Sequence, residues 1–326
     1  MKKIKPKMKV LISLFIICVL VVGGVFSYTF YQLNKIKTVK ISKTDKDLGI
    51  NSKTENAKGI TNIAFFGLDR TQKDEASRSD SIIIFSIDTK NNKIKMSSIM
   101  RDTYVKIKDH GETKIAHAYS YGGPQLAIRT INENFNLNIR DYITLDFFAL
   151  EKIIDAIGEV PIDIKQDEIG FINDKILEVS KIEKKSVPKI TKPGLQSLNG
   201  LQAVAYSRVR YTAGGDFRRI ERQKMVSEAI LTKIRSLGAT KFPGVVSMLL
   251  PYTETSITGM NIIKLGAEVL TSNKATFEQE RFPVDGYCSG KTIDKVWYLV
   301  ADMNSTIDQL HKFIFKDIKP VPKVPM

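Results

Sequence analysis

The sequence predicts an α/β protein: a three-layer α-β-α arrangement around a central mixed sheet, preceded by one N-terminal transmembrane helix. Strand-like and helix-like segments alternate along the chain after residue 59. Two strand-like segments are joined by the short polar turn 90–93, which favours an antiparallel pair and therefore a mixed sheet. Near the N-terminus, residues 10–31 form an apolar run that is long enough to span a membrane.

The N-terminal segment predicts a membrane anchor. Five lysines lie among residues 1–9, and residues 1–33 contain no acid. At 1.5 Å per residue, the apolar run 10–31 spans about 30 Å of hydrocarbon. Because a lysine-rich flank stays in the cytoplasm, we expect the rest of the chain outside the cell membrane. A cleavable signal peptide is the competing interpretation, although the apolar run is longer than is usual for one.

The composition predicts five segments along the chain and argues against cysteine-based sites. We expect a basic cytoplasmic N-terminus (1–9), a transmembrane helix (10–31), a polar extracellular stalk (32–58), one catalytic domain (59–315) and a Pro/Lys tail (316–326). Cys18 lies in the predicted span, which leaves only Cys288 outside and argues against a disulfide or a thiolate zinc site. The three histidines show no metal-ligand spacing.

Three strands open the predicted domain, at residues 61–69, 78–88 and from residue 94 onward. The apolar run of the second is typical of a strand covered on both faces. Each strand carries charged residues near one end, namely Asp69, Arg78, Asp80, Arg101 and Asp102.

The later elements follow from periodicity and from glycine and proline punctuation. Helices are expected at 114–136, 147–157, 218–237, 242–250, 260–270 and 294–315. Strands are expected at 141–146, 160–164, 203–211 and 276–284. The charged segment 166–192 is expected to be an irregular surface insertion.

An arginine-rich stretch, residues 208–223, holds five of the twelve arginines in the chain. A guanidinium group suits bidentate contact with phosphate or carboxylate better than an ammonium group does. In a strand 203–211, Arg208 and Arg210 would share one face. Asp216 follows a glycine pair, where the N-cap of the next helix is expected.

The helix expected after this turn places arginines on its apolar stripe. At 100° per residue, Arg219, Arg222 and Gln223 continue that stripe, whereas Arg218 and Lys224 face outward. The ordinary interpretation of a charge run is a solvated helix face. Because a buried cation needs an anion and no acid lies on the stripe, we predict that the missing anion is a ligand.

Asp69 and Asp80, at neighbouring strand ends, could share Mg²⁺, which takes some of its oxygen ligands from water and from substrate phosphate. Salt bridges between these acids and nearby arginines are the alternative. A formal net charge of +15 also predicts polyanionic surroundings. The predicted export of the domain argues against nucleic acid as that partner.

Several sequence blocks together resemble the LytR-CpsA-Psr family of bacterial cell-wall proteins. The blocks are Asp69, Arg78-Ser-Asp80-Ser, Ile99-Met-Arg101-Asp102, Lys114 to Tyr119 with Gly122-Gly-Pro124, Leu198 to Ala203, and Tyr206 to Arg210 through Asp216 to Gln223. Two positions depart from the family pattern. Met100 stands where proline is usual, and Arg218 stands where glycine is frequent, which adds a cation beside the site.

The resemblance implies an enzyme of a Gram-positive type of bacterium that transfers an anionic glycopolymer, of the teichoic acid or capsule type, from a polyprenyl-pyrophosphate carrier to peptidoglycan. By match to the family motifs, Asp69 and Asp80 would bind Mg²⁺. The pyrophosphate would be held by Arg78, Arg101, Arg208, Arg210, Arg219, Arg222 and Gln223. Arg101 would stabilise the charge of the transition state, and Asp216 or Asp102 could act as the general base.

Three other functions fit some of the same features. Water could replace the sugar acceptor, which would make the protein a lipid pyrophosphatase. The positive surface could bind an anionic wall polymer without catalysis, in which case binding would weaken with salt and need no metal. A nucleic-acid-binding regulator would fit the charge alone, but no recognition helix or RNA-binding aromatic motif is present in the sequence.

Overall fold

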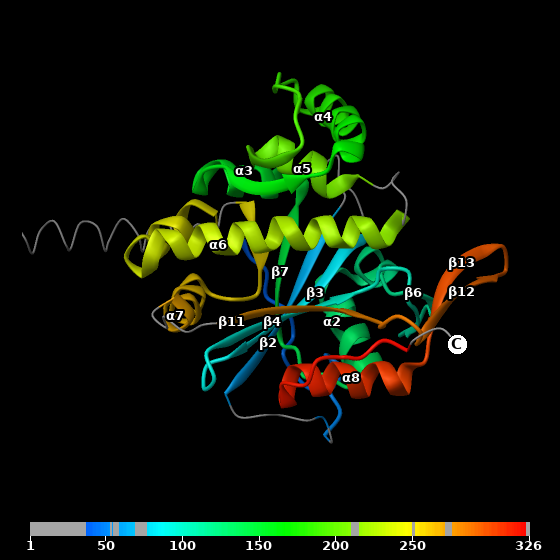
Figure 1. The fold of residues 1–326 in the computed structure, drawn as a ribbon. Helices are drawn as coiled ribbons and strands as arrows, with labels where there is room; N and C mark the ends of the chain where they lie inside the picture. Colours follow the sequence, from blue (N-terminus) through cyan, green and yellow to red (C-terminus); the bar gives the residue numbers. More distant parts are fainter. Residues whose placement is uncertain are drawn as a thin grey trace, which may run out of the picture.

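The computed structural model describes residues 37–52, 54, 59–68, 77–209, 215–249, 252–270 and 276–323. A seven-stranded mixed sheet forms the centre, with the strand order β1-β10-β7-β2-β3-β4-β11 (Figure 1). Its strands are β1 (Lys37–Thr38), β2 (Ile60–Leu68), β3 (Ser79–Asp88), β4 (Lys93–Ile99), β7 (Asp141–Asp146), β10 (Glu254–Thr255) and β11 (Thr276–Phe282). β3 pairs antiparallel with β2 and β4, while β7 and β11 run parallel to their neighbours β2 and β4. The predicted mixed α/β sheet is therefore confirmed.

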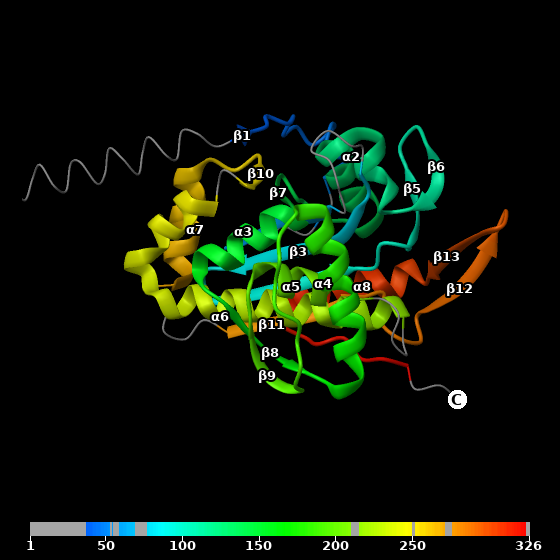
Figure 2. The ribbon, with the colours of Figure 1, turned by 90° about the horizontal axis from the view of Figure 1, so that it is seen from above.

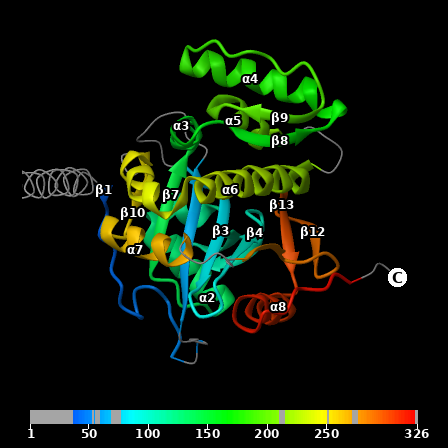
Figure 3. The same cartoon turned by 60° about the vertical axis from the view of Figure 1, so that its left-hand side comes forward.

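Helices cover both faces of this sheet. The helices of the described residues are α2 (His117–Phe135), α3 (Phe147–Ile157), α4 (Ile169–Glu183), α5 (Gly200–Arg208), α6 (Gly215–Leu249), α7 (Gly259–Leu270) and α8 (Met303–Lys316), and the 3-10 turn η1 (Gln166–Glu168) precedes α4. Figure 3 shows α3 and α6 on one face of the sheet and α2 and α8 on the other.

The buried apolar residues form two separate cores. Ile82 and Ile84 point to the α2 and α8 side and are buried in the first core, whereas Ile83, between them, points to the α6 side. The second core lies on the far side of α6 from the sheet, among α3, α4, α5 and the hairpin of β8 (Val160–Ile164) and β9 (Gly194–Leu198) (Figure 2). α6 thus lies between the sheet and this second core.

Two further hairpins lie outside the main sheet. β5 (Tyr104–Ile107) pairs with β6 (Gly111–Lys114), and β12 (Cys288–Ile293) pairs with β13 (Val296–Ala301). The expected helix 294–315 is therefore wrong in its first part, which is strand β13, and correct in its second part, α8. Likewise, the expected helix 114–136 begins only at His117.

Two other predicted elements are also wrong. The segment 166–192 contains the 15-residue helix α4, rather than an irregular insertion. The expected strand 203–211 is helical up to Arg208, because α5 begins at the capping residue Asn199, whose side chain accepts a hydrogen bond from the Gln202 N–H at 3.0 Å.

The N-terminal region is described only from residue 37. The predicted transmembrane segment 10–31 lies outside the described residues, and among those that are described no helix is long and apolar enough to cross a membrane. Part of the expected stalk packs on the domain, since Leu48 is fully buried and its carbonyl accepts a hydrogen bond from Asn132 on α2. The folded part of the chain thus begins before residue 59.

Candidate functional site

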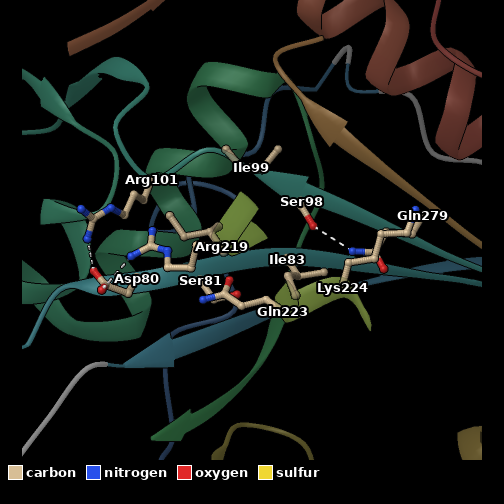
Figure 4. Close-up of a pocket in the computed structure, with 11 residues that line it drawn as sticks. Asp80, Ser81, Ile83, Ser98, Ile99, Arg101, Arg219, Gln223, Lys224 and Gln279 are labelled. Carbon is tan, nitrogen blue, oxygen red and sulfur yellow. Dashed lines mark hydrogen bonds and ion pairs between the residues drawn. The ribbon is translucent and has the colours of Figure 1, made fainter. Parts of the chain in front are cut away.

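The candidate site is organised around Asp80, which a β-bulge presents. Leu68 of β2 pairs with Ser79, but Gly67 pairs with Ser81, so Asp80 is the extra residue of β3. A bulge twists a strand locally and changes the direction of its side chains. The carboxylate of Asp80 is only 9% exposed and points towards α6 and the turn after β4 (Figure 4).

Two guanidinium groups bind this carboxylate. Arg101 Nη1 donates to Asp80 Oδ1 at 2.6 Å, and Arg219 Nη1 donates to Asp80 Oδ2 at 3.4 Å (Figure 4). Arg219 lies near the start of α6 and is 1% exposed, so its charge is held almost without water. Arg101 follows β4 and remains partly accessible.

A small open pocket lies beside this cluster, between the sheet and the start of α6. The pocket is partly open, and its volume of about 320 Å³ includes open solvent. Its lining residues are Asp80, Ser81, Ile82, Ile83, Ser98, Ile99, Arg101, Arg219, Gln223, Lys224 and Gln279. Among these, three cations face one carboxylate, which makes the pocket electropositive and suited to an anion.

Gln279 and Lys224 are pocket residues that the sequence did not indicate. The Gln279 amide donates to Ser98 Oγ at 3.3 Å, while its buried Oε1 has no hydrogen-bond partner among the described residues. A polar residue in the middle of the predicted strand 276–284 was the available signal. Lys224 was expected to face outward; its side chain is indeed 41% exposed, but it also lines the pocket.

Asp102 links Arg101 to a lysine on the β5–β6 hairpin. Asp102 Oδ2 lies 3.3 Å from Arg101 Nε, and Asp102 Oδ1 lies 2.6 Å from Lys114 Nζ. The carboxylate is buried, and it therefore fixes the direction from which Arg101 approaches Asp80. Asp102 is thus in place to orient Arg101.

The pKa of His117, the first residue of α2, is lowered by its surroundings. Burial lowers the pKa of His117 below its usual value, and the positive charges of Arg78 and Lys114 lower that pKa further. Its Nδ1 lies 3.0 Å from Thr113 Oγ1. The imidazole is therefore neutral at pH 7 and adds no charge to the site.

Arg222 has a protein anion as its partner. Its Nε and Nη2 donate to Glu168 Oε1 at 3.1 and 2.8 Å, and its Nη1 donates to the Val209 carbonyl at 3.0 Å. Both side chains are almost fully buried. The expectation that the buried arginines lack acids is therefore wrong, because Glu168 on η1 and Asp80 on β3 reach α6 from other elements.

Arg208 lies in a helix and not in the strand that was predicted for it. As the last residue of α5, it approaches Glu178 of α4 at 3.4 Å and stacks over the Phe147 ring at 4.8 Å. The pairing of Arg208 and Arg210 on one strand face is therefore wrong. Arg210 itself lies outside the described residues.

The remaining predicted residues are placed only in part. Arg78 is exposed just before β3, and Gln223 lines the pocket. Asp216 is the second residue of α6 and not the residue that precedes the helix, and its side chain is not described. Asp69 lies outside the described residues. Of the predicted site, the structure brings together Asp80, Arg101, Asp102, Arg219 and Gln223.

The described residues fit Mg²⁺ only as part of a larger ligand set. In the ranges that the structure covers, no three His, Cys, Asp or Glu side chains gather closely enough to hold a metal ion. Asp80 offers carboxylate oxygens, which suit Mg²⁺, but Arg101 and Arg219 already bind them. A metal here would need the other acid or substrate phosphate to complete its shell.

Comparison with known proteins finds relatives of this chain in bacteria. The regulatory protein MsrR of Staphylococcus aureus (strain COL) is 33% identical over 211 residues, which are 64% of this chain and 60% of MsrR. The polyisoprenyl-teichoic acid–peptidoglycan teichoic acid transferase TagT of Bacillus subtilis (strain 168) is 29% identical over 245 residues, which are 73% of each chain.

The fold is shared with solved structures. The structure of the LytR-CPS2A-psr family protein YwtF (TagT) with bound octaprenyl pyrophosphate lipid superposes with a TM-score of 0.62. The match covers 86% of this chain and 98% of that one at 22% identity, which shows a common fold. The sequence pattern of the LytR_cpsA_psr family matches residues 26–313, which make up most of the chain. The chain therefore belongs to the LytR_cpsA_psr family.

Proposed function

We propose that this protein is a membrane-anchored enzyme that transfers an anionic glycopolymer, of the teichoic acid or capsule type, from a polyprenyl-pyrophosphate carrier to peptidoglycan. The observation that supports this most strongly is the buried Asp80–Arg101–Arg219 cluster beside an electropositive pocket. The relatives support the same function, because TagT carries the name of such a transferase. Residues 10–31 would anchor the enzyme, with the domain outside the cell.

The arrangement suits phosphoryl transfer. In the proposed reaction, the oxygen of an acceptor hydroxyl bonds to the phosphorus that carries the glycopolymer. The bond between that phosphorus and the bridging oxygen breaks, and polyprenyl phosphate leaves. Arg101 and Arg219 would stabilise the charge that the phosphate oxygens gain, since fixed cations with little water are effective there.

The other site residues take supporting roles in this proposal. Gln223, which lines the pocket together with Arg219, would donate hydrogen bonds to the pyrophosphate. Asp102, which orients Arg101, or Asp216 would accept the proton of the acceptor hydroxyl. Asp80 would be one protein ligand of Mg²⁺ and Asp69 the other. The ion would neutralise negative charge on the pyrophosphate.

Removing the metal is expected to stop transfer. Treatment with EDTA should lower the rate of glycopolymer attachment at least tenfold, because the pyrophosphate loses a counter-ion, and excess Mg²⁺ should restore the rate. The measurement is the amount of labelled glycopolymer that becomes bound to peptidoglycan. Full attachment in EDTA would contradict the Mg²⁺ site, whatever the role of the arginines.

Replacing Arg101 by alanine tests the reaction itself. The full-length protein is incubated with polyprenyl-pyrophosphate-linked glycopolymer and peptidoglycan, and attached and released label are both measured. We expect Arg101→Ala to lower attachment by about a hundredfold or more, the usual cost of losing one donor to a transition-state oxyanion. Arg129→Ala is the matched control, because Arg129 lies on α2, on the face of the sheet opposite α6, where it binds Glu133 and the carbonyls of Lys46 and Asp47.

The same assay separates transfer from its rivals. Release of label at an equal rate with and without peptidoglycan would identify a pyrophosphatase. Retention of polymer without attachment or release, together with loss of retention in salt, would identify a non-catalytic binder.

A further inference from the structure

The β12–β13 hairpin projects from the body of the protein and exposes large side chains. In Figures 1 and 2 it extends away from the sheet beyond α8. Val296 is 41% exposed and Trp297 is 47% exposed. Large aromatic side chains left in water are often part of an interaction surface.

The indole of Trp297 packs closely against the backbone of this hairpin. Gly290, on the opposite strand, faces the ring so closely that a Cβ there would lie 2.7 Å from Trp297 Nε1 and 3.1 Å from two ring carbons. Only glycine leaves room for the ring at this distance from the backbone. The hairpin thus presents a pre-oriented aromatic surface, which lowers the entropic cost of binding.

This surface is joined to the candidate site by direct contacts. Lys114 Nζ lies 5.8 Å from the Trp297 ring and 5.9 Å from the Tyr298 ring, and it also binds Asp102 at 2.6 Å. Asp102 in turn lies against Arg101. The Leu299 N–H donates to the Asp102 carbonyl at 2.9 Å, which fixes β13 to the turn that carries Arg101.

A second aromatic contact fixes the other side of β13. Tyr298 packs edge to face on Tyr104 of β5, with ring centroids 4.8 Å apart. The two hairpins therefore pack on each other, and Lys114 lies between the rings of Trp297 and Tyr298; we call Trp297, Tyr298, Tyr104 and Lys114 the aromatic platform.

The chemistry of the platform fits a sugar chain. A pyranose ring has a flat C–H face that packs on an aromatic ring, and a rim of hydroxyl and amide groups that bind polar side chains such as lysine. Lys291 and Lys295, both exposed on the same hairpin, can donate hydrogen bonds to the hydroxyl and amide oxygens of such a chain. Aromatic rings suit neutral pyranoses better than a chain made mainly of phosphate.

We infer that the aromatic platform binds the glycan strand of the acceptor, a chain of N-acetylated pyranoses of the peptidoglycan type. The inference rests on the proposed function. The position of the platform favours the acceptor over the donor. In the proposed function the donor phosphate lies at Arg101 and Arg219, so the acceptor hydroxyl has to reach that phosphorus from a neighbouring surface. The platform adjoins the arginine cluster through Asp102.

Trp297 can serve as an intrinsic fluorescence probe of the platform, since it is the only tryptophan in the sequence. The full-length protein is titrated with soluble peptidoglycan glycan strands while tryptophan fluorescence is recorded. We expect a saturable change in intensity or wavelength with the glycan strands, and none with poly(glycerol phosphate). No response to the glycan strands, or an equal response to poly(glycerol phosphate), would overturn the assignment.

Kinetics then test whether this binding serves the reaction. Trp297→Ala should raise the KM for the acceptor about tenfold, the usual scale for losing an aromatic anchor, and leave the KM for the lipid-linked donor unchanged. Trp297→Phe, which keeps an aromatic face, should recover most of the acceptor affinity. The matched control is Tyr252→Ala, because Tyr252 is equally exposed and lies next to β10, which is at the opposite end of the molecule from the β12–β13 hairpin (Figure 2). Equal KM values for the acceptor in Trp297→Ala and the wild type would overturn the inference.

Failure of this inference can be told from failure of the proposed function. Glycan-dependent fluorescence in a protein that transfers nothing would keep the platform and overturn the function. Transfer by a protein whose fluorescence ignores the glycan would keep the function and overturn the platform. Arg101→Ala should still show the full fluorescence response, because Arg101 is placed in the reaction and not on the platform.

Discussion

Arg219→Ala is expected to lower glycopolymer transfer by about two to three orders of magnitude. Arg219 is 1% exposed, so its charge acts with little screening by water, and it binds the carboxylate oxygen of Asp80 that Arg101 does not bind. Removing one preorganised donor to a developing oxyanion commonly costs about 10²- to 10³-fold in rate. The measurement is the initial rate of attachment of labelled glycopolymer to peptidoglycan, at saturating donor and acceptor.

The neighbouring arginine provides the control. Arg218 has the same charge and lies on the same turn of α6, but its side chain is 44% exposed and pairs with Glu221 at 3.0 Å. Arg218→Ala should therefore keep the rate within about twofold, as surface ion pairs contribute little. Circular dichroism of both variants checks that they are folded. A folded Arg219→Ala enzyme as fast as Arg218→Ala would show that Arg219 only neutralises Asp80.

The outward position of Arg218 and the inward position of Arg219 could be predicted from helical periodicity alone. The same holds for β2, β7 and α3, whose residues match the expected segments almost completely, because strong local patterns and glycine or aspartate boundaries define them. The pairing of β3 with β4 followed from the short turn between them. These features depend on residues that are close in sequence.

Two helices were missed although local signals for them exist. α5 begins with Asn199 and Gln202, which bond reciprocally as a capping box, yet the helix is buried on nearly all sides and so shows no polar face. α4 carries Ile172, Ile176 and Val179 at helical spacing on its buried face, a stripe hidden among many charges.

The partners of the buried arginines could not be predicted in the same way. Asp80 meets Arg219 across 139 positions, and Glu168 meets Arg222 across 54 positions. The bulge that turns Asp80 towards α6 depends on the register between β2 and β3, which no single strand encodes. A helical wheel places an arginine on the buried stripe, but the anion that compensates it is chosen by the tertiary fold.

Glu168→Ala is expected to destabilise the protein by about 3–5 kcal/mol. The change leaves the guanidinium of Arg222 buried without its carboxylate, and breaking one side of a buried ion pair has a cost of that size. The measurement is the free energy of unfolding in urea, followed by circular dichroism. Glu228→Ala is the matched control, because Glu228 pairs with Lys224 at 3.9 Å on the exposed side of α6, and its loss should change stability by less than about 0.5 kcal/mol.

A double variant decides whether Arg222 acts on the substrate or on the fold. Replacing both charges, with Glu168→Met and Arg222→Leu, removes the ion pair without leaving either charge buried alone, so most of the lost stability should return. Three nitrogens of Arg222 are directed to Glu168 and to the Val209 carbonyl, so its main role here is to fix the start of α6 beside Arg219. We therefore expect the double variant to transfer glycopolymer within about tenfold of the wild-type rate, less than the loss on removing a preorganised donor. A double variant as stable as the wild type but as slow as Arg219→Ala would instead assign Arg222 to the pyrophosphate, as the family resemblance implies.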